Sequence, residues 1–130
     1  MWQLDTNIVI AYLNGNSAIA DKLKEHLPDV AISSLVLAEL LYGARASART
    51  KENIERVYQF LRIVTVADFD QASAAAYSRI RFALKQKGRP TGEVDMLIAA
   101  VAIANDATLV THNIKHFANI DDLRLEDWLT

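Results

Sequence analysis

Short apolar blocks and helically spaced apolar residues alternate along the whole 130-residue chain. The short blocks predict strands at residues 2–5, 30–33, 63–66 and 108–111, with a shorter one at 123–125. Between them, apolar side chains at i, i+3 and i+4 spacing predict helices at residues 8–13, 17–27, 34–43, 50–61, 70–87 and 93–105. Ser17 and Thr50 are the expected N-caps of two helices, while Asp70 opens the longest and Gly88 ends it.

Strands separated by helices predict βα crossovers, which are right-handed and require a mostly parallel sheet. We therefore expect an α/β fold, a single domain over residues 1–130 with a short central sheet of four to five strands and helices on both faces. No internal repeat and no linker interrupts the pattern. In such folds ligands bind at the carboxyl ends of the strands. This rule directs attention to residues 5–7, 33–34 and 111–113.

Composition narrows the class of protein. A chain that is 52% hydrophobic, with four glycines and two prolines, is neither disordered nor of low complexity. Because it has no cysteine, a disulfide scaffold and a thiolate zinc site are excluded. The longest uncharged apolar run, residues 96–104, is far shorter than the ~20 residues of a membrane span, and residues 1–5 lack the basic start of a signal peptide. We expect a cytoplasmic protein with no membrane partner.

Charge is distributed unevenly along the chain. Residues 45–89 contain ten basic and four acidic side chains, which gives them a net charge of +6. Because the whole chain has a net charge of −2, the two flanking segments together carry a net charge of −8. A basic middle with acidic flanks is typical of an acidic metal site beside a phosphate-binding surface. Solvated helix faces on an ordinary folded domain would give the same distribution.

Three carboxylates stand in segments that are otherwise apolar: Asp5 after the first strand, Glu39 within the leucine-rich residues 35–41, and Asp95 before the apolar residues 96–101. Asp5 and Asp95 each have an alternative role, because an aspartate caps a turn or stabilises a helix N-terminus. No cap explains Glu39 in mid-helix. A charged carboxylate is costly in an apolar environment unless it is paired, hydrogen-bonded or bound to a metal.

Taken together, the three acids form a set suited to a hard cation. Mg²⁺ and Mn²⁺ take oxygen ligands and keep waters or substrate phosphates in their remaining positions. Such an ion lowers the pKa of a bound water and neutralises charge on the phosphate that is attacked. The reaction class that follows is metal-assisted hydrolysis of a phosphodiester.

Neighbouring polar residues are candidates for supporting this site. Thr6, Asn7 and Thr111 are expected to hold Asp5 or a water in place, although Asn7 also suits a helix cap and Thr111 an ordinary strand. His112 and His116 bracket a loop, so their spacing does not predict a zinc site. Five basic side chains are candidate contacts for the phosphates of the substrate, with favourable helix C-terminal charge as the alternative role for some of them: Arg79, Arg81, Lys85, Lys87 and Arg89.

The acids stand in motifs that resemble a known family. The motifs are Leu4-Asp5-Thr6-Asn7, Ala38-Glu39-Leu40-Leu41-Tyr42-Gly43, Asp95-Met96-Leu97-Ile98-Ala99-Ala100, and Leu109-Val110-Thr111-His112-Asn113 followed by Phe117. Their order along the whole chain resembles the PIN domain, and within that family the chain is similar to the VapC toxins of bacterial toxin–antitoxin pairs. Each motif alone is weak, and the four in order are specific.

The resemblance implies a fold, an activity and partners. It implies an Mg²⁺- or Mn²⁺-dependent endoribonuclease, a hydrolase acting on RNA, built on a central parallel sheet. It assigns metal binding and catalysis to Asp5, Glu39 and Asp95. It further implies a homodimer and a cognate antitoxin protein that inserts into the active site, often with a basic side chain.

The chain departs from the family pattern in three places. Many relatives have a fourth acid where this chain has Asn113, which brings a carbonyl oxygen that can coordinate an ion or orient a water but no charge, so the number of ions held, one or two, stays open. Many also have an acid at the position of His116 and an Asn at that of Val94. Glu93 is a further candidate acid, although an acidic residue in a first helical turn needs no function.

Two other functional classes compete with the nuclease. A phospho-accepting receiver domain would need adjacent acids after the first strand, an Asp ending the third and a Lys near the last; the chain has Val64-Thr65-Val66 at the third strand and no suitable Lys. A catalytically silent PIN-like domain that binds RNA or a protein is the other alternative. A titration with Mn²⁺ separates it from the nuclease, because only the nuclease needs the ion.

Overall fold

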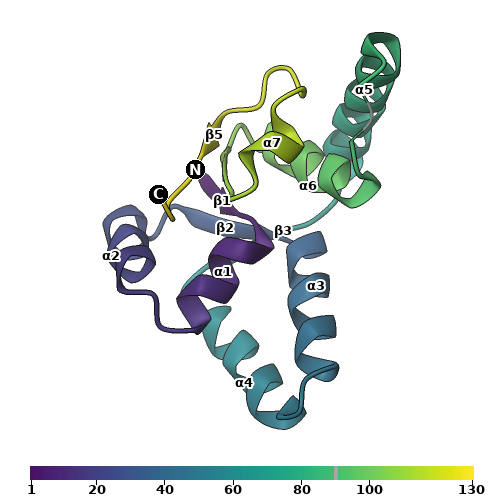
Figure 1. Ribbon diagram of the computed structural model, residues 1–130. Coiled ribbons are helices and arrows are strands. Elements are labelled where there is room, and N and C mark those ends of the chain that lie inside the picture. Colours follow the sequence, from purple (N-terminus) through teal and green to yellow (C-terminus); the bar gives the residue numbers. More distant parts are fainter. Residues whose placement is uncertain (90) are drawn as a thin grey trace.

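A five-stranded parallel sheet forms the centre of the protein (Figure 1). The structure is a computed structural model and describes residues 1–89 and 91–130. The strands lie in the order β3-β2-β1-β4-β5. Their bounds are Trp2–Leu4 (β1), Val30–Ser33 (β2), Thr65–Ala67 (β3), Thr108–Val110 (β4) and Leu125–Glu126 (β5). The predicted α/β fold with a mostly parallel sheet is thus confirmed.

The strand order creates a switch point in the middle of the sheet. The chain runs outward from β1 to β2 and β3, then returns to the other side of β1 as β4 and β5. Because parallel crossovers are right-handed, the outward and the returning connections cover opposite faces of the sheet. The carboxyl ends of β1 and β4 therefore diverge into different helical layers. In α/β folds, ligands bind in the crevice at such a point.

In residues 1–89 and 91–130, seven helices connect and cover the strands. They are α1 (Thr6–Leu13), α2 (Ser17–His26), α3 (Ser34–Arg45), α4 (Thr50–Phe60), α5 (Gln71–Lys87), α6 (Glu93–Ala104) and α7 (Ile114–Phe117). Helix α6 is buried on nearly every side, as its apolar sequence predicts, and α5 packs along it. Figure 1 shows the α3–α4 pair and the α5–α6 pair extending from the sheet in opposite directions.

The helix ends agree with the sequence prediction at some positions and differ by one residue at others. Asp70 caps α5 by accepting a hydrogen bond from the Ser73 N–H, and Gly88 ends it with a left-handed φ of 64°. Asn16, rather than Ser17, caps α2, because its side-chain oxygen accepts from the Ile19 N–H. Thr50 is the first residue of α4 and not its cap.

Two strands lie later in the chain than predicted, and one helix was not predicted. Residues 61–63 form a turn that continues α4, so β3 begins only at Thr65. The strand expected at 123–125 is β5, at Leu125–Glu126. Residues 114–117, expected as loop, form the short helix α7, which Phe117 anchors with a fully buried ring. No helix in residues 1–89 and 91–130 is long and apolar enough to cross a membrane.

The C-terminal segment is fixed to the first strand by aromatic and polar contacts. Glu126 accepts hydrogen bonds from the indole N–H groups of Trp2 and Trp128, at 3.4 and 3.1 Å. The His26 ring packs against both indoles, with centroid distances of 4.3 and 4.8 Å. The two ends of the chain are therefore joined beside the sheet (Figure 1).

Phe117 is expected to be the anchor on which the position of α7 depends. Replacing a fully buried Phe by Ala typically costs about 3–5 kcal/mol, so Phe117→Ala is expected to lower the free energy of unfolding by that amount. Phe82, on α5, is 64% exposed, and Phe82→Ala is the matched control, with an expected change of about 0.5 kcal/mol or less. Urea denaturation of both variants measures the difference, and equal effects would contradict the assignment.

Candidate active site

Asp5 is a buried carboxylate at the carboxyl end of the central strand β1. Its side chain is 6% exposed, and its backbone N–H donates to the Val110 carbonyl of β4 at 2.8 Å. The carboxylate accepts a hydrogen bond from the Thr6 N–H at 2.8 Å, so Asp5 is the N-cap of α1. Asn7, weighed from the sequence as the cap, does not have that role. Asp5 thus lies at the switch point of the sheet. The capping role that the sequence suggested as an alternative for Asp5 is confirmed.

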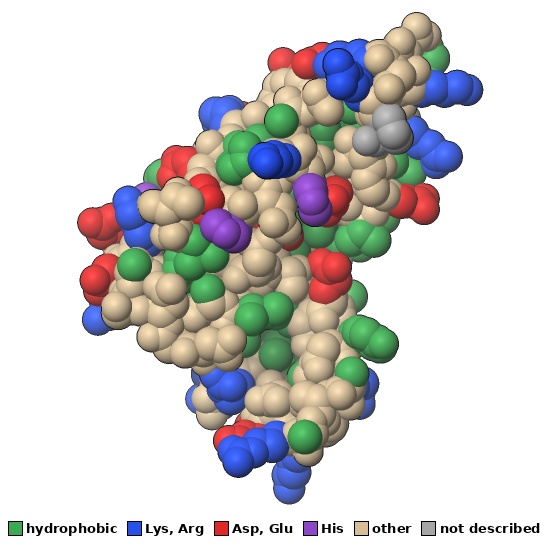
Figure 2. All heavy atoms as spheres, viewed as in Figure 1, with side chains coloured by type: hydrophobic (Ala, Val, Ile, Leu, Met, Phe, Trp, Pro, Cys, Tyr) green, Lys and Arg blue, Asp and Glu red, His purple; other side chains and the backbone are tan. Residues whose placement is uncertain are grey.

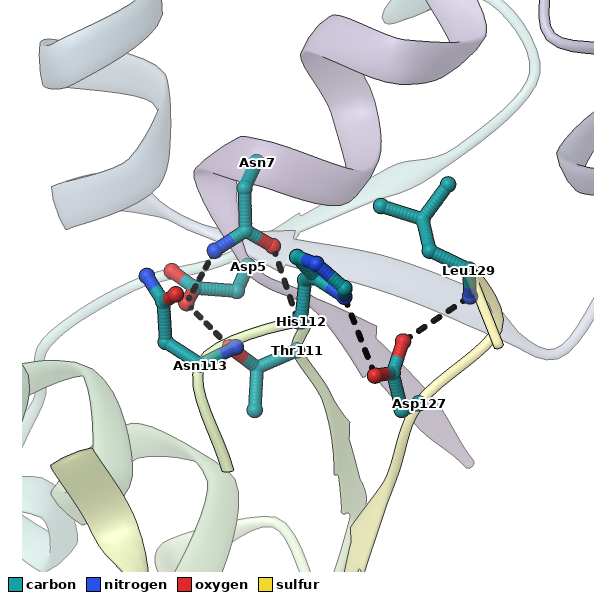
Figure 3. A network of polar contacts seen from close by, with 7 residues as sticks. All are labelled: Asp5, Asn7, Thr111, His112, Asn113, Asp127 and Leu129. Carbon is teal, nitrogen blue, oxygen red and sulfur yellow. Dashed lines mark hydrogen bonds and ion pairs between the residues drawn. The ribbon is translucent and has the colours of Figure 1, made fainter. Parts of the chain in front are cut away.

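The loop after β4 approaches Asp5 from the neighbouring strand. The hydroxyl of Thr111, a fully buried residue, donates to Asp5 Oδ2 at 2.8 Å. Asn7 Nδ2 lies 3.5 Å from the same oxygen, and Asn7 Oδ1 accepts from the His112 N–H at 3.1 Å. Figure 3 shows these side chains converging on Asp5 from β1, α1 and the 111–113 loop. The predicted supporting roles of Asn7 and Thr111 toward Asp5 have their geometric basis here.

Asn113 belongs to the same loop but does not contact the carboxylate. Its backbone N–H donates to the Thr111 hydroxyl at 3.0 Å, which orients that hydroxyl toward Asp5. The Asn113 side chain is exposed (Figure 3). The residue therefore acts on Asp5 through Thr111, while its side-chain oxygen stays available to water or a ligand.

Glu39 is exposed, which corrects the expectation that it lies in an apolar core. It occupies the solvent face of α3, while the buried face is formed by Val36, Leu40 and Ala44. Its Oε1 accepts a hydrogen bond of 2.6 Å from the Thr6 hydroxyl. Since the Thr6 backbone N–H donates to Asp5, Thr6 connects the two acids. Glu39 is therefore a candidate site residue because Thr6 connects it to Asp5, and not because it is buried.

Asp95 completes the acidic group from the first turn of α6. Partial burial raises the pKa of its carboxyl above the ordinary value of 3.8; His116 opposes this rise, and the negative charges of Asp5 and Glu39 add to it. The three acids therefore share one field, although they come from β1, α3 and α6. His116 Nδ1 lies 3.5 Å from Asp95 Oδ2.

The donors in this region suit a hard cation. In residues 1–89 and 91–130, no Lys or Arg forms an ion pair with any of the three acids, and His116 is the basic side chain that lies beside Asp95. A Cβ added at Gly92 would lie 3.3 Å from Asp95 Oδ2, so glycine keeps the space beside that oxygen open. No group of three Asp, Glu or His side chains in the described residues is positioned to hold one ion. Mg²⁺ needs only one or two carboxylates, since water completes its coordination.

The five predicted phosphate contacts separate into different environments. Arg81, Lys85 and Arg89 line one hollow of about 390 Å³ beside α6. Arg79 faces a different hollow on the other side of α5, and Lys87 pairs with Asp121 at 2.8 Å. Figure 2 shows Lys and Arg side chains gathered at the two far ends of the molecule, with histidine and acidic side chains adjoining near the middle of the face.

Glu93, the further candidate acid, does not join Asp5 or Asp95. Its carboxylate accepts from the Tyr77 hydroxyl at 3.4 Å, and that hydroxyl also accepts from Arg81 at 3.0 Å. Glu93 therefore interacts with the basic hollow on α5 through Tyr77.

Sequence reasoning missed one residue that holds the loop in place. The His112 ring contacts Asp127 Oδ2 at 3.0 Å, and Asp127 Oδ1 accepts from the Leu129 N–H at 2.8 Å (Figure 3). Asp127 is 14% exposed, and it connects the C-terminal segment to the loop that carries Thr111. An acid after the last short strand gives no signal of this contact, because the contact exists only once β5 is paired with β4.

Acidic side chains at the switch point of a parallel sheet are typical of α/β domains that bind a divalent cation. Residues 3–123 match the PIN domain family, and the chain belongs to this family and, within it, to the VapC ribonucleases. It is 40% identical to "Ribonuclease VapC2" of Rickettsia felis over 98% of both chains. It is 34% identical to "tRNA(fMet)-specific endonuclease VapC" of Shigella flexneri, over 98% of this chain and 97% of the relative.

Solved structures agree with these sequence relatives. The fold matches VapBC2 from Rickettsia felis, described as bound to a DNA fragment from its promoter, with a TM-score of 0.92, 39% identity and 98% of both chains covered. It matches DNA-bound VapBC from Salmonella typhimurium with a TM-score of 0.93 and 34% identity, over 98% of this chain and 97% of that one. The resemblance stated from the sequence motifs is confirmed.

The raised pKa of Asp95 predicts how the metal-free protein responds to pH. Because the folded-state pKa is above the unfolded value near 3.8, ionised Asp95 destabilises the fold at neutral pH, and the penalty disappears as pH falls through both values. Asp95→Asn is expected to be more stable than the parent at pH 7 in EDTA, with the advantage lost near pH 3.5. Denaturant unfolding at both pH values measures this, with Glu93→Gln as control. A variant that is less stable than the parent at pH 7 would contradict it.

Proposed function

We propose that this protein is a metal-dependent endoribonuclease, the toxin of a toxin–antitoxin pair, that hydrolyses RNA phosphodiester bonds. The observation that carries the proposal is the common field of Asp5, Glu39 and Asp95 at the switch point of the sheet, with no Lys or Arg paired to them in the described residues. The curated relatives are named as ribonucleases and as an endonuclease, which supports the same reaction class.

The chain's own residues supply orientation and charge. Thr111 and Asn7 hold Asp5 in one rotamer, and Thr6 orients Glu39 toward it. A bound Mg²⁺ or Mn²⁺ would supply an activated water and neutralise charge on the attacked phosphate. No Lys or Arg of the described residues pairs with these acids, and His116 lies beside Asp95.

The substrate we propose is RNA with accessible single-stranded segments. RNA is cut and read most readily in loops, where bases are unstacked and the backbone is free. The Shigella flexneri relative is named for tRNA(fMet), which makes the loops of a tRNA a suitable first substrate. The hollow lined by Arg81, Lys85 and Arg89 is a suitable site for the phosphates that flank the cut.

An antitoxin protein and a homodimer are the proposed protein partners, and the cytoplasm the proposed compartment. The similar structures are described as VapBC complexes, from Rickettsia felis and Salmonella typhimurium. A hollow of about 250 Å³ between α1, α3 and α4 is a suitable antitoxin site, because it combines an apolar wall with Glu39 at its edge. A partner seated there would cover one of the three acids.

Removal of the metal or of an acid is expected to abolish cleavage. Cellular RNA including tRNA is incubated with the protein in Mg²⁺, in Mn²⁺ and in EDTA, and fragment ends are mapped. Residues that only support metal ligands change activity by about 10–100-fold, so Asp5→Asn and Asp95→Asn are expected to lower the rate about a hundredfold or more. Asp21→Asn, at an exposed position on α2, is the matched control. Variants that cleave like the parent would contradict the proposal, and a parent that neither cleaves RNA nor binds Mn²⁺ would support the silent alternative.

The basic hollow predicts a change in the salt dependence of RNA binding. Each phosphate contact with single-stranded nucleic acid contributes about 0.7 to the slope of log affinity against log salt. Lys85→Gln/Arg89→Gln is therefore expected to weaken binding and to reduce that slope by about 1.4. Fluorescence anisotropy with labelled RNA in EDTA measures both quantities. Arg79→Gln, on the same helix but in another hollow, is expected to leave the slope unchanged, and equal effects of the two changes would argue against the assignment.

A further inference from the structure

His116 lies against the acidic group, on the short helix α7. The neighbouring Phe117 is fully buried and fixes that helix, while the His116 side chain is 58% exposed. Its Nδ1 is 3.5 Å from Asp95 Oδ2, and both side chains line a hollow of about 370 Å³. The imidazole therefore has room to turn toward Asp95 without disturbing the core.

The other two histidines have different contacts, and all three lie in the described part of the chain. His112 Nδ1 is 3.0 Å from Asp127. His26 Nδ1 is 2.7 Å from the Lys22 carbonyl, and its ring packs against Trp2 and Trp128. His116 is thus the one histidine of the three whose ring faces a carboxylate of the acidic group.

The two side chains are near enough to bind one ion together. Neighbouring ligands of an octahedral ion, each at ~2.1 Å from it, lie about 3 Å apart, and the observed gap is 3.5 Å. A charge-assisted hydrogen bond would be about 2.7–2.9 Å long. An exposed ion pair at the longer distance adds little stability, so pairing alone gives this contact little purpose.

We propose that His116 is a nitrogen ligand of the catalytic metal ion, beside Asp95, and that it shifts the preference of the site from Mg²⁺ toward Mn²⁺. The inference rests on the proposed metal-dependent function. Mg²⁺ takes oxygen donors almost exclusively, whereas imidazole is a good ligand for transition-metal ions. A site in which an imidazole and the Asp95 carboxylate bind the ion together therefore retains Mn²⁺ while binding Mg²⁺ less well.

The test is to detect the nitrogen directly. Tag-free full-length protein is loaded with Mn²⁺, and pulsed electron paramagnetic resonance is used to look for ¹⁴N coupling from a bound imidazole. The parent and His112→Gln are expected to show it, and His116→Gln and His116→Glu are expected to lose it. His116→Gln is expected to bind Mn²⁺ about tenfold or more weakly. His116→Glu, which restores an oxygen donor, is expected to keep Mn²⁺ and to need about tenfold less Mg²⁺ to displace it than the parent needs.

The outcomes separate the role of His116 from the proposed metal-dependent function. Bound Mn²⁺ without ¹⁴N coupling in the parent would overturn the role of His116 and leave the metal site standing. Coupling that persists in His116→Gln and disappears in His112→Gln would show that His112, and not His116, is the nitrogen ligand. A parent that binds no Mn²⁺ at all would overturn both the ligand and the proposed metal-dependent function.

Discussion

The buried carboxylate of Asp5 is the constraint on which the arrangement of the site depends. A negative charge at 6% exposure is tolerated only if its lone pairs are satisfied. The Thr6 N–H, the Thr111 hydroxyl and the Asn7 amide supply those hydrogen bonds. The same contacts fix the start of α1 and the loop after β4, so one carboxylate joins two parts of the chain that lie 106 positions apart.

This requirement also explains how the other acids come near Asp5. Thr6 donates to Asp5 through its backbone and to Glu39 through its hydroxyl, so the first residue of α1 connects the strand end to α3. Asp95 enters from the opposite direction, because α6 returns toward the centre of the sheet before β4. The three acids thus share a field without contacting one another through hydrogen bonds. A cation placed among them would relieve a repulsion that the fold maintains.

The sequence predicted the sheet and most helices, because those depend on local periodicity, and the strand ends directed attention to Asp5 and to residues 111–113. For Glu39 the expected burial was wrong, since a leucine-rich segment does not show which face of α3 is exposed. Helix α7 was missed because four residues have no detectable periodicity and only the burial of Phe117 fixes them. The contacts of Asp127 and His116 were not predictable, since both arise from tertiary packing.

The position of β1 has a consequence for the order in which the protein is completed during synthesis. β1 is translated first but lies between β2 and β4. Thr111, whose hydroxyl donates a hydrogen bond to Asp5, follows Asp5 by 106 positions. The Glu126 contact that ties down the end of the chain follows Trp2 by 124. A growing chain that ends before β4 therefore has all three acids but no assembled crevice between β1 and β4. The crevice is thus assembled only after β4 has been added and paired with β1, late in the synthesis of the 130-residue chain.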